Sequence, residues 1–213
     1  MPNYLHHTFD GGGIAIWHIT ESSSELYEQL DTHRYDARLA TLTHEGRRAE
    51  WLAVRLLVSQ VLGCDKEIAY HATGRPYLTD GSYHISISHT RGYAAIAYHR
   101  SVRIGVDIEY ISSRVERIAH RFTHASEAAY LDAAPAAQRT MLQLINWSAK
   151  ETLYKIFDTP AAADFRAAFA IGSYLPEQQG ELAAMVSLPT QTLCTVHYSL
   201  FPDFVCTWAL LPQ

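Results

Sequence analysis

Apolar residues recur along the chain at two different spacings, which together predict a mixture of helices and strands. A short strand is predicted over 14–19, after a glycine-rich segment, 10–13, that reads as flexible, and a helix is predicted over 22–30. The clearest helix runs from about residue 45 to residue 62, where apolar side chains return at helical spacing. Gly63 follows as a stop signal, so we expect this helix to end there.

The remaining apolar runs are shorter and are separated by turn residues. Strands are predicted over 67–71, 82–88, 93–99, 102–109, 165–171, 182–188, 194–200 and 204–211. Helical structure is predicted over 113–131, and a long helix over 137–157, stopped by Pro160. Helix followed by strands thus occurs twice, which predicts an α+β fold built as a pseudo-dimer of two similar α/β subdomains, 1–101 and 102–213.

Composition narrows the class of protein. Of the 213 residues, 48% are hydrophobic and 18% are charged, as in globular proteins, and no apolar run is long enough to span a membrane. The formal net charge of -5 argues against a general nucleic-acid binder. The three cysteines lack the spacing of a disulfide framework or a zinc site, and the N-terminus does not resemble a secretion signal, so we expect a cytoplasmic protein.

Two carboxylates share one face of a predicted strand. Period-two alternation over 104–109 sends Val106 and its isoleucine neighbours to one face, and Gly105, Asp107 and Glu109 to the other. Two like charges on a strand that is anchored in a core cost free energy unless a cation or a basic group neutralises them. Mg²⁺, which binds carboxylate, water and phosphate oxygens, is the natural candidate. The alternative is that this face simply contacts solvent, as is common in antiparallel sheets.

A third carboxylate lies on the long predicted helix, almost opposite its apolar stripe of Leu142, Ile145, Ala149, Leu153 and Ile156. Glu151 and Lys155 are four residues apart and are therefore neighbours on the helix. They form either a surface ion pair or a functional pair, in which Glu151 completes a metal site and Lys155 contacts a phosphate of the same ligand. Trp147, one turn earlier, either walls the site or packs in the core.

Two further segments carry groups suited to phosphate. Gly74-Arg75-Pro76 places a guanidinium in a turn that proline stiffens. The strand over 82–88 runs into Ser88, His89 and Thr90, three hydrogen-bonding side chains. Adjacent residues on a strand point to opposite sides, so His89 is poorly placed to activate Ser88 as a nucleophile, and a ligand contact explains it better. The alternatives are an exposed turn arginine and a structural histidine.

A basic helical face is predicted directly after the carboxylate strand. Arg114, Arg117 and Arg121 are spaced i, i+3 and i+7, so they lie on one side of this segment if it is helical. An acidic helix of a partner protein is one occupant of such a face. A solvated surface is the other reading.

Four segments in this order resemble the signature of the Sfp-type 4′-phosphopantetheinyl transferases. They are Gly74-Arg75-Pro76, Ile87-Ser88-His89-Thr90, Gly105-Val106-Asp107-Ile108-Glu109 and the stretch from Trp147 to Lys155. Each segment is weak or moderate alone, and their order and gaps make the match specific. The resemblance covers roughly residues 74 to 155, and the rest of the chain adds little to it.

The resemblance implies transfer of 4′-phosphopantetheine from coenzyme A to a serine of an acyl or peptidyl carrier protein, with Mg²⁺, releasing 3′,5′-ADP. It implies that Asp107, Glu109 and Glu151 bind the metal, with Glu151 as a possible base. It also implies that Lys155 and His89 contact the coenzyme A phosphates, with Ser88 beside them. The C-terminal subdomain would then hold the metal site and the carrier-docking surface, and the N-terminal subdomain the nucleotide contacts.

The nucleotide end of coenzyme A is less well defined. The resemblance implies that Arg75 contacts it, although the family usually has lysine there, which changes the donor geometry. Members also use a basic residue from the N-terminal half for the 3′-phosphate. Arg38, Arg48 and Arg55 all compete for this role, and we favour Arg48, with Arg55 close behind.

Two other functions use the same residues. A magnesium-dependent phosphohydrolase or nuclease would need the same three carboxylates, and a non-catalytic module would hold coenzyme A or a carrier protein without transferring anything. No nucleic-acid or membrane partner is expected, and the chain is expected to be a monomer. The physiological carrier protein is not defined by the sequence.

Overall fold

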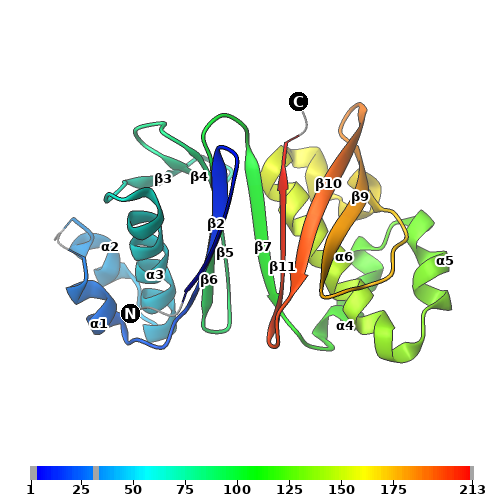
Figure 1. Ribbon diagram of the computed structural model, residues 1–213, viewed down its shortest axis with the longest axis horizontal. Helices are drawn as coiled ribbons and strands as arrows, with labels where there is room; N and C mark the ends of the chain where they lie inside the picture. Colours follow the sequence, from blue (N-terminus) through cyan, green and yellow to red (C-terminus); the bar gives the residue numbers. More distant parts are fainter. Residues whose placement is uncertain (1–3, 31–33, 212–213) are drawn as a thin grey trace. The chain divides into compact units, whose positions relative to one another are not determined.

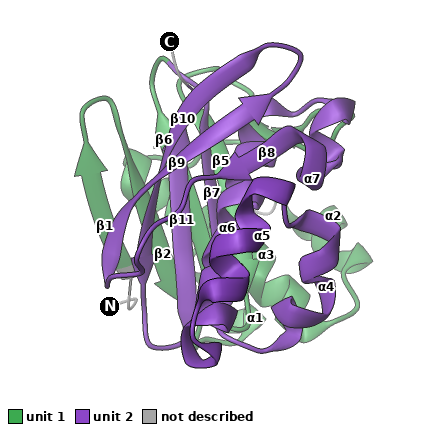
Figure 2. Cartoon of the chain, turned by 90° about the vertical axis from the view of Figure 1, so that its right-hand side faces the viewer, with its two compact units in different colours: residues 1–101 green, residues 102–213 purple. Residues whose placement is uncertain are grey.

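The computed structural model describes residues 4–30 and 34–211. These residues form helices and antiparallel strands, so the predicted α+β class is confirmed. The chain divides into two compact units, Met1–Ser101 and Val102–Gln213, coloured separately in Figure 2. Within the described residues, no helix is both long enough and apolar enough to cross a membrane.

Unit 1 contains one four-stranded antiparallel sheet with strand order β1-β2-β6-β5. Its elements are β1 (Tyr4–Phe9), β2 (Gly12–His18), α1 (Ser23–Glu28), α2 (Asp36–Thr41), α3 (Glu45–Leu62), β3 (Ile68–Tyr70), β4 (Pro76–Leu78), β5 (His84–Thr90) and β6 (Tyr93–His99). Helix α3 lies along one face of the sheet (Figure 1) and buries its apolar stripe there, including Leu52 and Leu57, against Trp17 and Ile96. It ends at Gly63, as predicted.

The glycine-rich segment at the start of unit 1 is not the flexible stretch that the sequence suggested. Gly12 begins β2, where it pairs with Phe9 of β1 and His99 of β6. A side chain at Gly12 would place its Cβ 2.3 Å from the Tyr98 carbonyl oxygen, so glycine is needed for close strand packing. The sequence also missed α2 and the short strands β1 and β4, which lack a clear apolar period.

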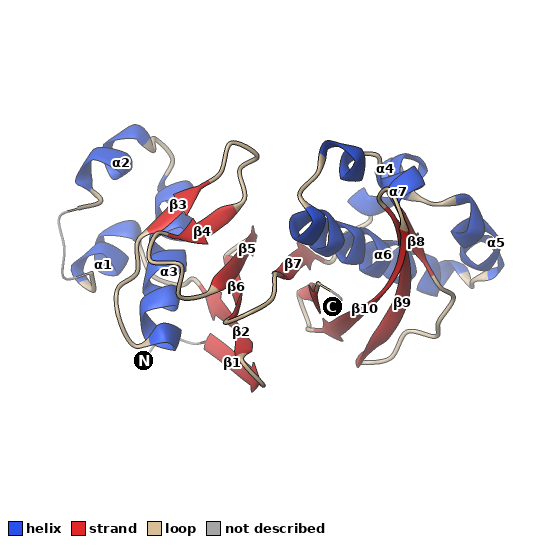
Figure 3. Ribbon diagram, turned by 90° about the horizontal axis from the view of Figure 1, so that it is seen from above, coloured by secondary structure: helices blue, strands red, loops and turns tan. Residues whose placement is uncertain are grey.

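Unit 2 contains a five-stranded antiparallel sheet with strand order β7-β11-β10-β9-β8. Its elements are β7 (Ile104–Tyr110), α4 (Arg114–Phe122), α5 (Ala125–Ala133), α6 (Ala136–Phe157), η1 (Pro160–Ala163), α7 (Phe165–Ala168), β8 (Phe169–Ile171), β9 (Gln179–Ser187), β10 (Gln191–Leu200) and β11 (Phe204–Leu210). The sheet curves around α6, as Figure 3 shows. The predicted strand over 165–171 is half helix, because Asp164 accepts hydrogen bonds from the backbone of Arg166 and Ala167 and so caps α7.

Strand β7 and helix α6 approach each other very closely at Gly105. A Cβ on this residue would lie 2.4 Å from the Thr152 carbonyl oxygen and 2.8 Å from Cγ1 of Ile156, both on α6. Only glycine leaves room for the helix backbone at this distance. The close approach sets the separation between the strand that carries Asp107 and Glu109 and the helix that carries Glu151.

Candidate functional site

The strand face that carries Asp107 is covered by a helix. The predicted alternation is present, because Gly105 faces α6 and Asp107 bonds to side chains of α6. Asp107 is only 4% exposed, so the alternative of a solvated strand face is wrong. The other face is buried too, with Val106 fully inaccessible. A carboxylate in this position needs a counter-charge or hydrogen-bond donors.

Both oxygens of Asp107 receive a donor from α6. Lys155 Nζ lies 2.9 Å from Oδ1 and also donates to the Val106 carbonyl oxygen at 2.8 Å. Ser148 donates its hydroxyl proton to Oδ2 at 2.8 Å. Lys155 is thus paired with the strand carboxylate in a partly buried ion pair between the two elements, in place of the surface ion pair with Glu151 that was one of the two alternatives.

Glu109 lies two residues further along β7 and is held by the indole of α6. Trp147 donates its Nε1–H to Glu109 Oε1 at 2.7 Å. Burial raises the pKa of Glu109, and the nearby Asp107 charge adds to the rise. The ring of Trp147 packs on Phe122 and Phe165, with centroids 5.1 and 5.4 Å away. Trp147 therefore serves both the carboxylate site and the core, two roles that the sequence left as alternatives.

Glu151 projects from α6 beside these two carboxylates. Burial is the largest effect on it and, with the charges of Asp107 and Glu109, raises the pKa of Glu151 to about 7, while Lys155 opposes the rise. The described residues give its carboxylate no hydrogen-bond donor, unlike Asp107 and Glu109. Glu151 therefore has the acceptor capacity that a ligand or a reacting hydroxyl group requires.

The three carboxylates have the chemistry of a magnesium site. They provide only oxygen ligands, and Lys155 supplies one positive charge against the three carboxyl groups. Burial, and after it the charges of the neighbouring carboxylates, raises the pKa of Glu109 and of Glu151. Among residues 4–30 and 34–211, no three His, Cys, Asp or Glu side chains are arranged as a site that could by itself hold a metal ion. Mg²⁺ does not need one, because it usually takes one or two carboxylates and completes its shell with water and phosphate. The residues present therefore fit this ion.

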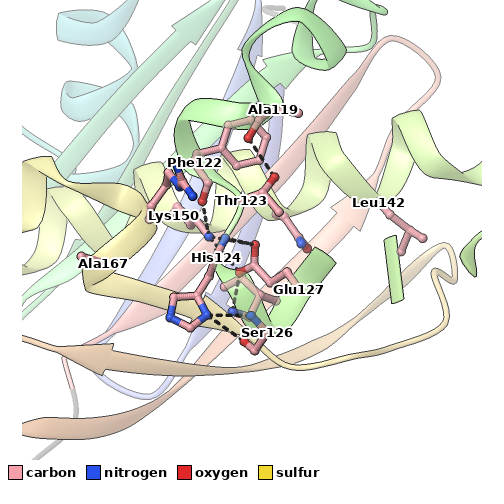
Figure 4. A network of polar contacts seen from close by, with 12 residues as sticks. Ala119, Phe122, Thr123, His124, Ser126, Glu127, Leu142, Lys150 and Ala167 are labelled. Atoms are coloured by element: carbon pink, nitrogen blue, oxygen red, sulfur yellow. Dashed lines mark hydrogen bonds and ion pairs between the residues drawn. The ribbon is translucent and has the colours of Figure 1, made fainter. Parts of the chain in front are cut away.

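A buried ion pair between Lys150 of α6 and Glu127 of α5 joins α6 to neighbouring elements (Figure 4). Lys150 and Glu127 are both fully inaccessible, and Lys150 Nζ donates to Glu127 Oε2 at 2.9 Å and to the Phe122 carbonyl oxygen at 2.6 Å. Glu127 also accepts from the backbone N–H of His124 at 3.0 Å and of Ile171 at 2.7 Å. One ion pair thus joins α6 to the end of α4, the start of α5 and strand β8.

The predicted basic face exists on α4. Arg114, Arg117 and Arg121 are all exposed on this helix. The charge of Arg114 is close enough to lower the pKa of Glu109 slightly against the effects of burial. Arg114 also lines a cavity of about 270 Å³ together with Glu109 and Trp147. The basic face of α4 therefore begins beside the carboxylate site.

Unit 1 brings some of the predicted coenzyme A residues together and separates others. Arg55 and His89 line one cavity of about 280 Å³, together with Arg38 and Arg47. His89 Nδ1 lies 3.5 Å from Glu50 Oε2 in this cavity. The favoured Arg48 lines a different cavity beside Ser23 and Tyr27.

Arg55 is unusual among the arginines because it is only 4% exposed. Its guanidinium lies 3.3 Å from the ring centroid of Trp51 and donates to the Trp51 carbonyl oxygen at 3.0 Å. Burial lowers the pKa of Arg55. Ser88, at 7% exposed, is more buried than the exposed His89, and Arg75 is partly buried in the turn between β3 and β4. The stacked guanidinium is held rigidly at the cavity wall.

The carboxylate site lies within a segment that matches a known protein family. Residues 103–208, which contain all three carboxylates and Lys155, match the family model described as the 4′-phosphopantetheinyl transferase superfamily. The chain belongs to this superfamily. It is also 29% identical over 123 residues to 4′-phosphopantetheinyl transferase AcpT of Salmonella typhimurium, and 28% identical to AcpT of Salmonella typhi. Each alignment covers 56% of this chain and 64% of the relative.

Several residues at this candidate site were not singled out from the sequence. Ser148 and Thr207 complete the polar surroundings of Asp107, and Lys150 pairs with Glu127. A serine, a threonine and a charged residue inside an otherwise apolar helix or strand are weak signals of buried hydrogen bonding. Their partners lie on other elements, so only the tertiary structure identifies them.

Proposed function

We propose that this protein transfers the 4′-phosphopantetheine group of coenzyme A to a serine hydroxyl of an apo acyl or peptidyl carrier protein. The products are the holo-carrier and 3′,5′-ADP. The observation that carries the proposal is the cluster on β7 and α6 of Asp107, Glu109, Glu151 and Lys155, within the segment that matches the superfamily. The activity belongs in the cytoplasm, with the protein acting as a monomer.

Asp107, Glu109 and Glu151 are the residues that would hold Mg²⁺. When bound, the ion would supply positive charge to stabilise the negative charge that develops on 3′,5′-ADP as the pyrophosphate bond breaks. The excess of negative charge among these three side chains supports this assignment.

Lys155 has one donor left for a phosphate. An ammonium group has three N–H donors, and the Val106 carbonyl oxygen and Asp107 take two of them. The third is available for an oxygen of the coenzyme A pyrophosphate, where it offsets the charge that develops as 3′,5′-ADP leaves. Pairing with Asp107 keeps the ammonium in place before the substrate arrives.

Glu151 is the residue proposed to take the proton of the carrier serine. Its carboxylate accepts no hydrogen bond from the described residues, so it is available to accept a hydroxyl proton directly or through a water molecule. Asp107 and Glu109 are already engaged by Ser148, Lys155 and Trp147, which leaves them as ligands only.

The cavity of unit 1 supports a role in holding the nucleotide end of coenzyme A. Arg38, Arg47 and Arg55 gather there with His89, and several cations around one cavity suit a phosphate. We therefore assign the 3′-phosphate to these arginines and place Arg48, which lines another cavity, outside this contact. Arg75 and Ser88 remain proposed contacts of the same substrate.

The exposed arginines of α4 are the proposed docking surface for the carrier protein, and the two units are proposed to be a pseudo-dimer. In both units, a strand followed by a long helix (β2 and α3, β7 and α6) pairs with the last strand of the unit (β6, β11). The strand before that last one pairs on its other side. This shared order supports descent from one duplicated subdomain.

The test is incubation of the purified protein with coenzyme A, Mg²⁺ and a panel of apo-carrier proteins. Mass spectrometry of each carrier should show the added mass of phosphopantetheine, and chromatography should show one 3′,5′-ADP per modified carrier. Free phosphate products without carrier modification would replace the proposal with a phosphohydrolase. Binding of coenzyme A or carrier without any product would replace it with a non-catalytic module.

A further inference from the structure

A chain of hydroxyl groups runs through the interior of unit 2 and ends at Asp107. Thr207 of β11 is the direct cross-strand partner of Asp107 on β7, so the two side chains emerge on the same face of the sheet. Ser148 and Thr152 of α6 meet them there. All three hydroxyl residues are fully inaccessible.

The distances define the direction of the chain. Thr152 Oγ1 lies 2.7 Å from Thr207 Oγ1, Thr207 Oγ1 lies 2.9 Å from Ser148 Oγ, and Ser148 Oγ lies 2.8 Å from Asp107 Oδ2. A carboxylate only accepts, and each hydroxyl has a single proton. Ser148 therefore donates to Asp107, and the other two contacts between hydroxyls hold together only if Thr207 donates to Ser148 and Thr152 to Thr207 Oγ1. This arrangement satisfies all three contacts at once, and every donor points toward Asp107. The single Thr152 proton is shared with the Thr207 carbonyl oxygen, which lies 3.2 Å from Thr152 Oγ1.

Packing alone does not call for these hydroxyls. Valine has nearly the shape of threonine and would fill the space of Thr207 without burying a hydroxyl, which costs free energy unless it is fully paired. Replacing a whole buried hydrogen-bonded chain by apolar groups of the same shape is often nearly neutral for stability. What apolar residues could not provide is a fixed donor for the second oxygen of Asp107.

Thr207 controls that donor through Ser148. With Thr207 in place, the Ser148 oxygen accepts from Thr207 and its proton is directed at Asp107. Without the threonine hydroxyl, the serine can rotate and donate instead to a carbonyl one turn earlier in α6, as helical serines commonly do. Asp107 Oδ2 would then lose the Ser148 hydrogen bond, and repulsion from Glu109 and Glu151 would displace its carboxylate.

We propose that Thr207, acting through Ser148, is a positioning residue that fixes the Asp107 carboxylate, with Oδ2 held by Ser148 and Oδ1 by Lys155, in the orientation in which it would bind a divalent cation. The cation part of this statement rests on the proposed function, and the link from Thr207 to Asp107 does not. Groups that orient a ligand typically affect metal affinity or activity by about 10- to 100-fold.

The experiment compares Thr207→Val, which removes the hydroxyl, with Thr207→Ser, which keeps it. Mn²⁺ binding to the full chain with coenzyme A and no carrier, followed by electron paramagnetic resonance of the free ion, should weaken about 10- to 100-fold in Thr207→Val. Thr207→Ser should stay within about 3-fold of wild type, and Ser148→Ala should match Thr207→Val without adding to it. Thr195→Val, the same change at an exposed position on the neighbouring β10, is the control and should bind normally.

A second measurement does not depend on metal, coenzyme A or carrier. Urea denaturation of Thr207→Val should show a lowered midpoint, and the shift should become smaller when Asp107→Ala has already removed the end of the chain. An equal shift in both backgrounds, or Mn²⁺ affinity as weak in Thr207→Ser as in Thr207→Val, would overturn the positioning role. Coupling in urea together with a wild-type protein that modifies no carrier would leave Thr207 as a positioning residue and refute the proposed function instead.

Discussion

Glu151 differs from the other two carboxylates in the way its neighbours engage it. Asp107 receives donors from Lys155 and Ser148, and Glu109 receives one from Trp147. Glu151 stands beside them with no donor from the described residues. Asp107 and Glu109 are thus held in place by hydrogen bonds, whereas the Glu151 carboxylate is available to exchange a proton.

Replacing Glu151 by glutamine should reduce carrier modification by at least about 100-fold, because general base catalysis by a placed side chain contributes about 100- to 10,000-fold. The amide keeps the size of the side chain and loses its negative charge and its basicity. Initial rates of holo-carrier formation, read by mass spectrometry at saturating coenzyme A, provide the measurement.

Glu28→Gln is the matched control, since Glu28 is an exposed carboxylate on α1 outside the site. It should modify the carrier at the wild-type rate. Wild-type turnover in Glu151→Gln would remove Glu151 from both the metal-binding and the proton-accepting roles.

The residues of unit 2 that carry the site were predictable where a strong local pattern existed. Alternation over 104–109 placed Asp107 and Glu109 on one face, and helical spacing placed Glu151 near Lys155. What covers that face was not predictable, because the covering residues Ser148 and Lys155 are 41 and 48 residues away from Asp107 in the chain. The same reason explains why Thr207 escaped notice, since its role depends on cross-strand pairing of β11 with β7.

At the scale of elements, the separation of β7 and α6 depends on a glycine, Gly105, where the two elements meet. Gly105→Ala would introduce a Cβ 2.4 Å from the Thr152 carbonyl oxygen, so α6 must shift away from the strand. Overpacking of this kind costs about 1–3 kcal/mol. We expect a lowered urea midpoint and a carrier-modification rate that falls in the folded protein, because Glu151 and Lys155 move with the helix.

Gly46→Ala is the matched control for this substitution. Gly46 lies in the first turn of α3, and nothing within 4 Å would meet its added Cβ. This change should leave activity unaltered and raise stability by up to about 1 kcal/mol, since alanine favours the helix. Destabilisation of both variants to the same extent would contradict the close-packing explanation for Gly105.

The buried Lys150–Glu127 pair should anchor α6 to the elements behind it. Lys150→Met, which keeps the length of the side chain, should cost about 3–5 kcal/mol in free energy of unfolding, because Glu127 stays buried without its cation. Glu127→Leu should lower the free energy of unfolding by at least as much. It removes the hydrogen-bond acceptor of Lys150 and of the backbone N–H groups of His124 and Ile171. Urea denaturation monitored by tryptophan fluorescence measures both.

The double variant of Lys150→Met and Glu127→Leu should lose less stability than the sum of the two single variants, because no unpaired charge remains in the core. Strict additivity would show that the two groups do not depend on each other. Secondary structure alone would not reveal this anchor. The sequence pattern correctly predicted a helix over 137–157, but the partners of Lys150 lie on other elements.

At the scale of the whole molecule, the two units were predictable to different degrees. The strong apolar period of α3 and α6 predicted both long helices within one residue of their observed ends. The choice among Arg38, Arg48 and Arg55 was not predictable, because helical spacing says which face a residue occupies and not which cavity that face lines. The structure separates Arg48 from the cavity that holds Arg38, Arg55 and His89.

The distribution of charge over the molecule determines how it would attract a carrier protein. The formal net charge of -5 would repel an acidic carrier protein on average, so attraction has to come from a local basic surface. The exposed arginines of α4 supply it beside the carboxylate site. Attraction of this kind is screened by salt, with a Debye length of about 8 Å at physiological ionic strength. The KM for the carrier should therefore rise with added salt, while the KM for coenzyme A depends on other residues.

Reversing one of these charges should separate docking from chemistry. Arg117→Glu removes an attraction to an acidic carrier and adds a repulsion. Each exposed charge pair contributes up to about 1 kcal/mol, so losing one attraction and gaining one repulsion should raise the KM for the carrier about 5- to 30-fold, with little change in kcat. The salt dependence of that KM should weaken as well. Arg166→Glu makes the same change in net charge at an exposed position on α7 and serves as the control. Equal effects of the two reversals would mean that net charge, not the α4 surface, governs the encounter.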